Sequence, residues 1–226
     1  PVLSRGLGDV YKRQSLGSGG RMNIEKDEVL ITSGVINNLS TGGPIAIKII
    51  NKDWKNWKDK EIEPFVVPRP GHADLVGTFK YQHDDIRLSL ERASARETAI
   101  RCAIGAICHQ ILNQLGVEVV GYVSSIGEQK LENINLEDIG QIKKLVDESE
   151  VSCPDKETSE LMINEILKAR KKKDTLGGSI TLVAKNFPAG CGSYVHFDRK
   201  LDAKLASSMM SVPVSYTHLR AHETTL

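Results

Sequence analysis

The residues best suited to chemistry lie in one segment, 69–101, with the sequence RPGHADLVGTFKYQHDDIRLSLERASARETAIR. The segment opens with a Pro-Gly turn followed by His72. Because proline fixes φ and glycine permits a tight turn, the sequence predicts a stiff loop that holds this imidazole. Imidazole exchanges a proton near neutral pH, so a positioned histidine suits general acid–base chemistry. A lone histidine is usually structural, but the neighbouring arginines and the rigid turn favour a functional role for His72.

Arginines gather around this turn and around the helix start that follows it: Arg69, Arg92, Arg96 and Arg101. A guanidinium binds phosphate or carboxylate through two parallel hydrogen bonds, which lysine cannot do. Ser94 and Glu97 have the S-x-x-E spacing of a capping box, so a helix should start there and offer free N–H groups and a positive dipole end. Surface ion pairs with acidic neighbours, such as Asp74 and Glu91, are the alternative. We predict a site for a small, multiply anionic ligand, with His72 as proton donor.

The other polar motifs are weaker candidates. We expect His83 to face solvent, His109 to pack within a helix or an interface, and His196 to be structural at a strand end. The histidine spacings lack a suitable third ligand, which argues against a metal site. The glycine-rich stretch at 15–21 lacks the spacing of a P-loop or a dinucleotide-binding turn, so a flexible connection is favoured over a phosphate cradle.

Composition narrows the class of protein. The chain has 226 residues, a formal charge of +1, 40% hydrophobic and 26% charged residues. These values are ordinary for a globular protein, and the near-neutral charge argues against nucleic acid or a membrane as partner. Trp54 and Trp57 stand among lysines at 51–60 and could stack on bases, but a loop whose rings pack on the core is favoured. The four cysteines form no C-x-x-C pair, which suggests a reduced, cytoplasmic protein without zinc or a disulfide framework.

Hydrophobic periodicity predicts an α+β fold rather than repeating βαβ units. Strands at 28–35 and 45–50 should pair as an antiparallel hairpin across a turn at 41–44. The best helix, 95–115, should end at Gly116, and its alanines and Gly105 should permit close packing on a sheet. The remaining predicted elements are strands at 117–126 and 179–187 and helices at 136–149, 156–173 and 201–211.

A series of short motifs follows in a recognisable order along the chain. The central segment carries RPGHAD, then KY, then D-x-R at Asp85 and Arg87, then ERASARETA. The order continues outside it with GGRMNIEKD, SGV, GGPIA and NKDW before it, and with PAGCGSYV-x-F-D-R-x-LD and MMSVP after it. The combination of RPGHAD with SARET is highly specific. Over residues 15–213 the sequence resembles the chorismate synthase family.

The resemblance implies a fold and an activity. The fold would be a β-α-β sandwich of the chorismate synthase type, incomplete at both ends. The activity would be that of a carbon–oxygen lyase of the shikimate pathway, which serves aromatic amino acid biosynthesis. Such enzymes convert 5-enolpyruvylshikimate 3-phosphate to chorismate by anti-1,4-elimination of phosphate. They need reduced FMN without net redox change, and they form homotetramers. The resemblance leaves open whether NADPH reduces the flavin.

The resemblance also implies roles for particular residues. His72 would be catalytic, protonating or tuning the reduced flavin. Arg92, Ala93 and Ser94 would contact the cofactor, and Arg69 and Arg96 would bind the anionic groups of the substrate.

Three departures from the family pattern limit what this chain should do alone. The sequence lacks the family's G-E-S-H-G segment, the arginine-rich segment before the glycine loop, and the C-terminal half. Residues 1–14 and 214–226 resemble translated adaptor sequence and are expected to be foreign, leaving 15–213 as a partial domain. We therefore expect the chain by itself to be inactive. A non-catalytic anion- or nucleotide-binding module and a basic nucleic-acid binder are the alternatives.

Overall fold

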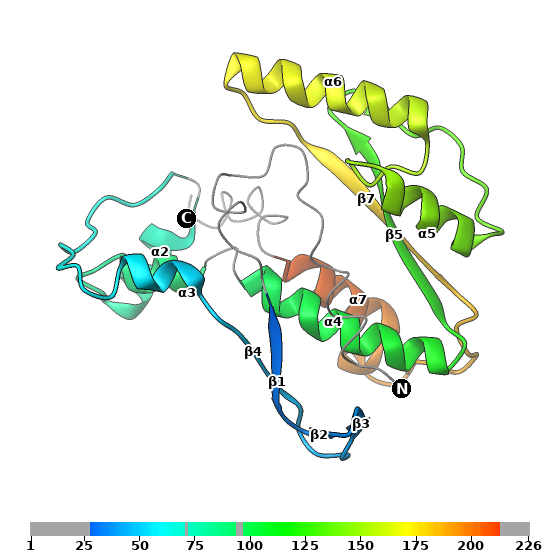
Figure 1. Cartoon of the computed structure of the whole chain (residues 1–226), viewed down its shortest axis with the longest axis horizontal. Coiled ribbons are helices and arrows are strands. Elements are labelled where there is room, and N and C mark those ends of the chain that lie inside the picture. The colour runs from blue at the N-terminus through cyan, green and yellow to red at the C-terminus, as the bar shows by residue number, and fades with distance from the viewer. Residues whose placement is uncertain (1–27, 71, 94–96, 213–226) are drawn as a thin grey trace. The chain divides into compact units, whose positions relative to one another are not determined.

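A computed structural model describes residues 28–70, 72–93 and 97–212, which divide into two compact units. Residues 106–188 form the sheet unit, and residues 28–105 together with 189–212 form the site unit (Figure 1). The expected foreign ends at 1–14 and 214–226 and the glycine-rich stretch at 15–21 lie outside the described residues. None of the helices in the described ranges is long and apolar enough to span a bilayer.

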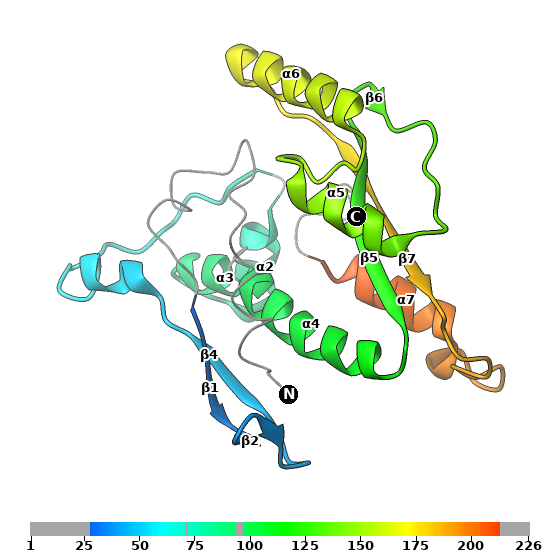
Figure 2. The ribbon, with the colours of Figure 1, turned by 45° about the vertical axis from the view of Figure 1, so that its right-hand side comes forward.

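The sheet unit is built on two long antiparallel strands, β5 (Glu118–Ile126) and β7 (Gly178–Lys185). The two-residue strand β6 (Gln129–Lys130) pairs with the other edge of β5, giving the order β6-β5-β7 (Figure 2). The register runs from Glu118 opposite Lys185 to Ile126 opposite Gly178, with one irregularity between Val123 and Ser125. Both long strands were predicted, and their β-branched residues explain why they form.

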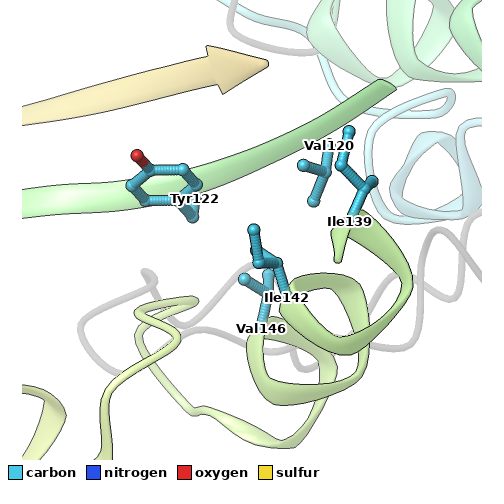
Figure 3. Close-up of a cluster of buried hydrophobic side chains, with 5 residues drawn as sticks. All are labelled: Val120, Tyr122, Ile139, Ile142 and Val146. Carbon is cyan, nitrogen blue, oxygen red and sulfur yellow. The ribbon is translucent and has the colours of Figure 1, made fainter. Parts of the chain in front are cut away.

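Two helices cover one face of this sheet, α5 (Ile139–Glu148) and α6 (Lys156–Lys172). Each begins at an aspartate whose side chain accepts a hydrogen bond from a backbone N–H of the first turn: Asp138 from Gln141 and Asp155 from Thr158. One cluster of the unit's core lies between β5 and α5 and comprises Val120, Tyr122, Ile139, Ile142 and Val146 (Figure 3). A second cluster comprises Val151, Cys153 and Met162. Both predicted helices are confirmed, and each buries one apolar stripe.

The site unit begins with the predicted antiparallel hairpin of β1 (Val29–Ser33) and β4 (Ala46–Ile49). A smaller hairpin, β2 (Val35–Ile36) and β3 (Leu39–Ser40), lies between them and was not predicted. It turns through Asn37 and Asn38, whose φ angles are +51° and +63°. Asparagine tolerates this left-handed backbone, so the Asn-Asn pair was the signal for the turn.

The tryptophan segment is a 3₁₀ helix, η2 (Lys52–Asn56), and not a plain loop. The expectation that its rings pack on the core is wrong, because Trp54 is 60% exposed and Trp57 is 46% exposed. Local contacts hold Trp57 instead. Its indole N–H donates to Asp53 at 2.9 Å, and the Lys60 ammonium lies 4.9 Å from the ring centroid.

Three helices follow in the central segment: α2 (Ala73–Tyr81), α3 (Arg87–Arg92) and α4 (Glu97–Gln114). Only α4 was predicted. It ends as expected at Gly116, with φ +76°, where the Gly116 and Val117 N–H groups bond back to the carbonyls of Asn113 and Leu112. A Cβ at Gly105 would meet no described atom within 4 Å outside the helix's own backbone, and packing of this helix face on a sheet stays a prediction.

The last elements of the site unit are a short 3₁₀ helix, η3 (Phe197–Arg199), and the predicted helix α7 (Leu201–Met210). Antiparallel strands and helices mix without a βαβ repeat, so the α+β fold class is confirmed.

Candidate functional site

The site unit holds one fully buried acid, Asp74, which organises the side chains around it. Asp74 lies in the first turn of α2 and has no exposed surface. A carboxylate at this place is favoured by the positive end of the helix dipole. His72 is the N-cap residue of α2, with φ −117° and ψ 165°, and its ring makes no capping hydrogen bond.

The Asp74 carboxylate is paired with the Arg69 guanidinium through both oxygens. Arg69 Nε donates to Oδ2 at 2.8 Å and Arg69 Nη2 donates to Oδ1 at 3.0 Å, while the Arg69 backbone N–H donates to Oδ2 at 3.1 Å. These bonds outweigh the effect of burial and lower the pKa of Asp74 to about 2. The same side-chain bond raises the pKa of Arg69. Asp74 is therefore ionised at neutral pH.

His72 joins this pair through Nδ1. That nitrogen lies 2.9 Å from Asp74 Oδ1 and 3.2 Å from Arg69 Nη2. The His72 side chain remains 33% exposed, so the ring is fixed at one nitrogen and still accessible. The structure thus brings together two of the residues predicted from the sequence, His72 and Arg69, through a third whose burial was not foreseen.

Sequence analysis gave surface ion pairs as the alternative role for the arginines. Arg69 does form an ion pair with Asp74, but Asp74 is buried and not on the surface. The guanidinium remains 47% exposed beside the bound carboxylate. Asp74 occupies Nε and Nη2, and contact of the remaining guanidinium surface with a substrate anion stays a prediction.

Two of the three predicted cofactor residues lie at the end of α3. Arg92 is its last residue, and Ala93 is the C-cap. Arg92 borders an open hollow of about 450 Å³. The lining combines apolar, amide, cationic and acidic side chains: Ile49, Asn51, Glu91, Arg92, Glu97, Ala99 and Ile100. Ser94 and Arg96, predicted for cofactor and substrate, lie outside the described residues.

This lining fits one part of FMN and not another. Apolar walls with hydrogen-bonding groups suit a flat heteroaromatic ring such as a flavin. Two carboxylates, Glu91 and Glu97, offset the charge of Arg92, so a phosphate group needs more positive charge than the described lining supplies.

Close packing of α2 on α3 connects the two parts of the site. A methyl group at Gly77 in α2 would lie 2.5 Å from the Ser89 hydroxyl of α3. His83 Nδ1 lies 3.3 Å from the same hydroxyl, and its ring stacks on Tyr81 with centroids 5.6 Å apart. His83 is half-buried, so the expectation that it faces solvent is wrong.

The remaining sequence candidates have structural contacts. Arg101 donates to Glu97 at 3.3 Å and to the Ser211 hydroxyl at 2.8 Å, which ties α4 to the residue after α7. His109 packs as predicted, with Nε2 3.3 Å from the Val119 carbonyl. His196 does not end a strand but precedes η3. In the described ranges, no three His, Cys, Asp or Glu side chains are grouped to hold a metal ion.

Asp74 is the residue of the candidate site that the sequence analysis undervalued. It appeared there only as a partner for surface arginines. A signal was available, because an acid three residues after the Pro-Gly turn falls in the first turn of a helix, where its charge is favoured.

Comparison with known proteins places these motifs in a family. A family model described as chorismate synthase matches residues 7–217. The chain is 45% identical over 214 residues to a chorismate synthase of Bacillus licheniformis and 44% identical over 210 residues to one of Caldicellulosiruptor bescii. In each case 89% of this chain and 55% of the relative are covered, so the chain spans about half the length of these curated relatives.

A solved structure agrees with the sequence comparisons. A crystal structure of chorismate synthase superposes with a TM-score of 0.74 at 33% sequence identity, covering 92% of this chain and 57% of that one. The matched family model includes the RPGHAD segment that folds around Asp74, together with Arg92 and its hollow. The chain therefore belongs to the chorismate synthase family.

Proposed function

We propose that this chain contributes to the chorismate synthase reaction, the anti-1,4-elimination of phosphate from 5-enolpyruvylshikimate 3-phosphate. The observation that carries the proposal is the accessible imidazole of His72, fixed at Nδ1 beside the buried Asp74–Arg69 pair. A fixed, accessible imidazole suits a group that moves a proton at a defined place. The motif that forms this network is among those by which the chain resembles its family.

The residues of this chain would divide the work between proton transfer and anion binding. His72 holds and moves the proton. Arg69 and Arg96 bind the phosphate and carboxylates of the substrate, because bidentate guanidinium contacts suit these groups. Arg92, Ala93 and Ser94 contact FMN, and the apolar side of the Arg92 hollow suits its ring. Reduced FMN, when bound, supplies the electron-rich ring on which this elimination depends.

The proposal extends to the setting of the reaction. The near-neutral charge of the chain favours a small-molecule substrate over nucleic acid or a membrane surface. A homotetramer, a cytoplasmic location and NADPH as the source of reducing equivalents are parts of the proposal that rest on the family resemblance.

The proposal is tested in a protein that joins this chain to the segments by which the Bacillus licheniformis relative exceeds it, hereafter the completed protein. Chorismate formation is followed by absorbance under anaerobic conditions with pre-reduced FMN. We expect substrate-dependent release of equal amounts of chorismate and phosphate. Binding of the substrate without turnover would instead support the alternative of a non-catalytic anion-binding module.

A further inference from the structure

We propose that Asp74 is a positioning residue, whose carboxylate keeps one proton on His72 Nδ1 and so leaves Nε2 as the nitrogen that exchanges protons with the reactants. The assignment of Nε2 to proton exchange rests on the proposed function. The assignment of the Nδ1 proton rests on geometry alone. The residues involved are Arg69, His72 and Asp74.

The geometry decides between the two neutral forms of the ring. An ionised carboxylate only accepts hydrogen bonds, and Asp74 Oδ1 lies 2.9 Å from His72 Nδ1. Without a hydrogen on Nδ1, two lone pairs would face each other at this distance. With a hydrogen there, the contact becomes a charge-assisted hydrogen bond of ordinary length.

Arg69 is the competing neighbour, and its contacts lead to the same result. Its Nη2 lies 3.2 Å from His72 Nδ1 and 3.0 Å from Asp74 Oδ1. A bare Nδ1 could accept from Arg69, but it would still face the carboxylate oxygen at 2.9 Å. A protonated Nδ1 leaves Arg69 to donate to Oδ1, so every group in the cluster is satisfied. Oδ1 then accepts from both Arg69 and His72.

The carboxylate is also held rigidly enough to orient the ring. Asp74 is fully buried and accepts three hydrogen bonds from Arg69, one of them from the backbone N–H. The Thr78 hydroxyl donates to the Asp74 carbonyl at 2.8 Å, within the same helix. A buried acid that fixes the tautomer of a histidine acts as the aspartate does in a Ser-His-Asp triad. The contacts of the ring with described polar groups are made by Nδ1.

The substitution Asp74→Asn changes the hydrogen-bonding groups that face His72 and leaves the size of the side chain nearly unchanged. Asparagine has nearly the same shape, but its amide N–H₂ can donate to a bare Nδ1. The neutral ring can then carry its proton on Nε2. Asp155→Asn is the matched control, because Asp155 caps α6 and asparagine caps helices about as well.

The proton position is measured by magic-angle-spinning ¹⁵N NMR of the 226-residue chain with labelled histidine rings. Spectra are recorded at about pH 9, where a free imidazole carries a single ring proton. The chain has six histidines, so the His72 signals are identified by their loss in His72→Gln. We expect protonated Nδ1 and bare Nε2 in the unsubstituted chain and in the control variant, Asp155→Asn. We expect the reverse in Asp74→Asn.

The unsubstituted chain decides the question even if Asp74→Asn fails to fold. A proton on Nε2 at this pH in the unsubstituted chain would overturn the proposal. So would an Asp74→Asn ring that keeps its proton on Nδ1, because Asp74 would then not set the tautomer.

Activity of the completed protein provides the second readout. Asp74→Asn should lower kcat about 10- to 100-fold, the usual effect of losing a group that orients a functional side chain. In a His72→Ala background the same substitution should have almost no further effect on kcat. A full additional loss there would overturn the positioning role. Failure of the proposed function looks different: the unsubstituted completed protein would form no chorismate, while the tautomer measurement would be unaffected.

Discussion

Replacing Asp74 by asparagine should destabilise the site unit at neutral pH and much less in acid. The pKa of Asp74 is lowered from 3.8 to about 2 in the folded protein, chiefly by the side-chain hydrogen bond from Arg69. A shift of this size corresponds to at most ~2.5 kcal/mol of folding free energy at neutral pH. Because the Arg69 side chain is 47% exposed, solvent screens the pair, and we expect about 1–2 kcal/mol.

The sign of the pH dependence follows from the direction of the shift. A carboxyl whose pKa is lower in the folded state contributes stability that is fully present above its unfolded pKa. That contribution is lost as the pH falls through the folded pKa, here between about pH 5 and pH 2. The difference in unfolding free energy between the original chain and Asp74→Asn should therefore shrink to about half its neutral value near pH 3.

Urea denaturation followed by tryptophan fluorescence measures this difference, because both tryptophans, Trp54 and Trp57, belong to the site unit. Asp59→Asn is the matched control. Asp59 is exposed and lies 3.8 Å from the Lys58 ammonium, so its replacement should change stability by no more than about 0.5 kcal/mol. Equal destabilisation by Asp74→Asn at pH 7 and pH 3 would refute the reasoning, since the loss would then not depend on the charge.

Other substitutions test the packing and the anion contacts. Gly77→Ala should destabilise the site unit by about 1–2 kcal/mol in the same assay, because the new methyl group overlaps a hydroxyl of α3. Gly105→Ala should stabilise it by about 0.5–1 kcal/mol, since the methyl meets no described atom within 4 Å and alanine favours a helix; a loss of stability would contradict this. Met162→Ala should destabilise the fully buried core of the sheet unit by about 2–5 kcal/mol, measured by circular dichroism. In the completed protein, Arg92→Met should weaken FMN binding about tenfold by fluorescence titration, and Arg96→Lys should raise KM for the substrate with little change in FMN affinity.

Strong periodicity and end signals made most of the fold predictable. Helix α4 was foreseen from its apolar spacing and from Gly116, and α6 from Asp155 and its charged exposed face. The outer hairpin of β1 and β4 followed from two short apolar runs across a turn. Local sequence suffices for such elements, because capping and periodicity act within a few residues.

Helices α2 and α3 were missed because tertiary packing, not local preference, favours them. In α2 the apolar residues Leu75, Val76 and Phe79 are largely exposed, so no buried apolar stripe marks the helix. Gly77 lowers the local preference for a helix, yet it permits the close approach of α3. Such a contact cannot be read from spacing within one segment.

The site was predictable in its residue types and not in its connections. The sequence pointed to His72 and Arg69, which are three residues apart around the turn. It did not reveal that Asp74 would be fully buried between them, because burial depends on the whole unit. The hollow at Arg92 likewise uses Ile49 and Asn51, which lie about 40 positions earlier in the chain and reach it only through the fold.

The central claim is that His72 moves the proton, and the turnover rate of two His72 variants of the completed protein tests it most directly. With pre-reduced FMN under anaerobic conditions, His72→Ala should lower kcat about 100-fold or more and change KM much less, because the proposed function assigns the substrate anions to the arginines. His72→Asn should be similarly slow, although its amide can still hydrogen-bond to Asp74. Turnover close to the original rate in His72→Asn would contradict the account, because the histidine would then only brace the loop.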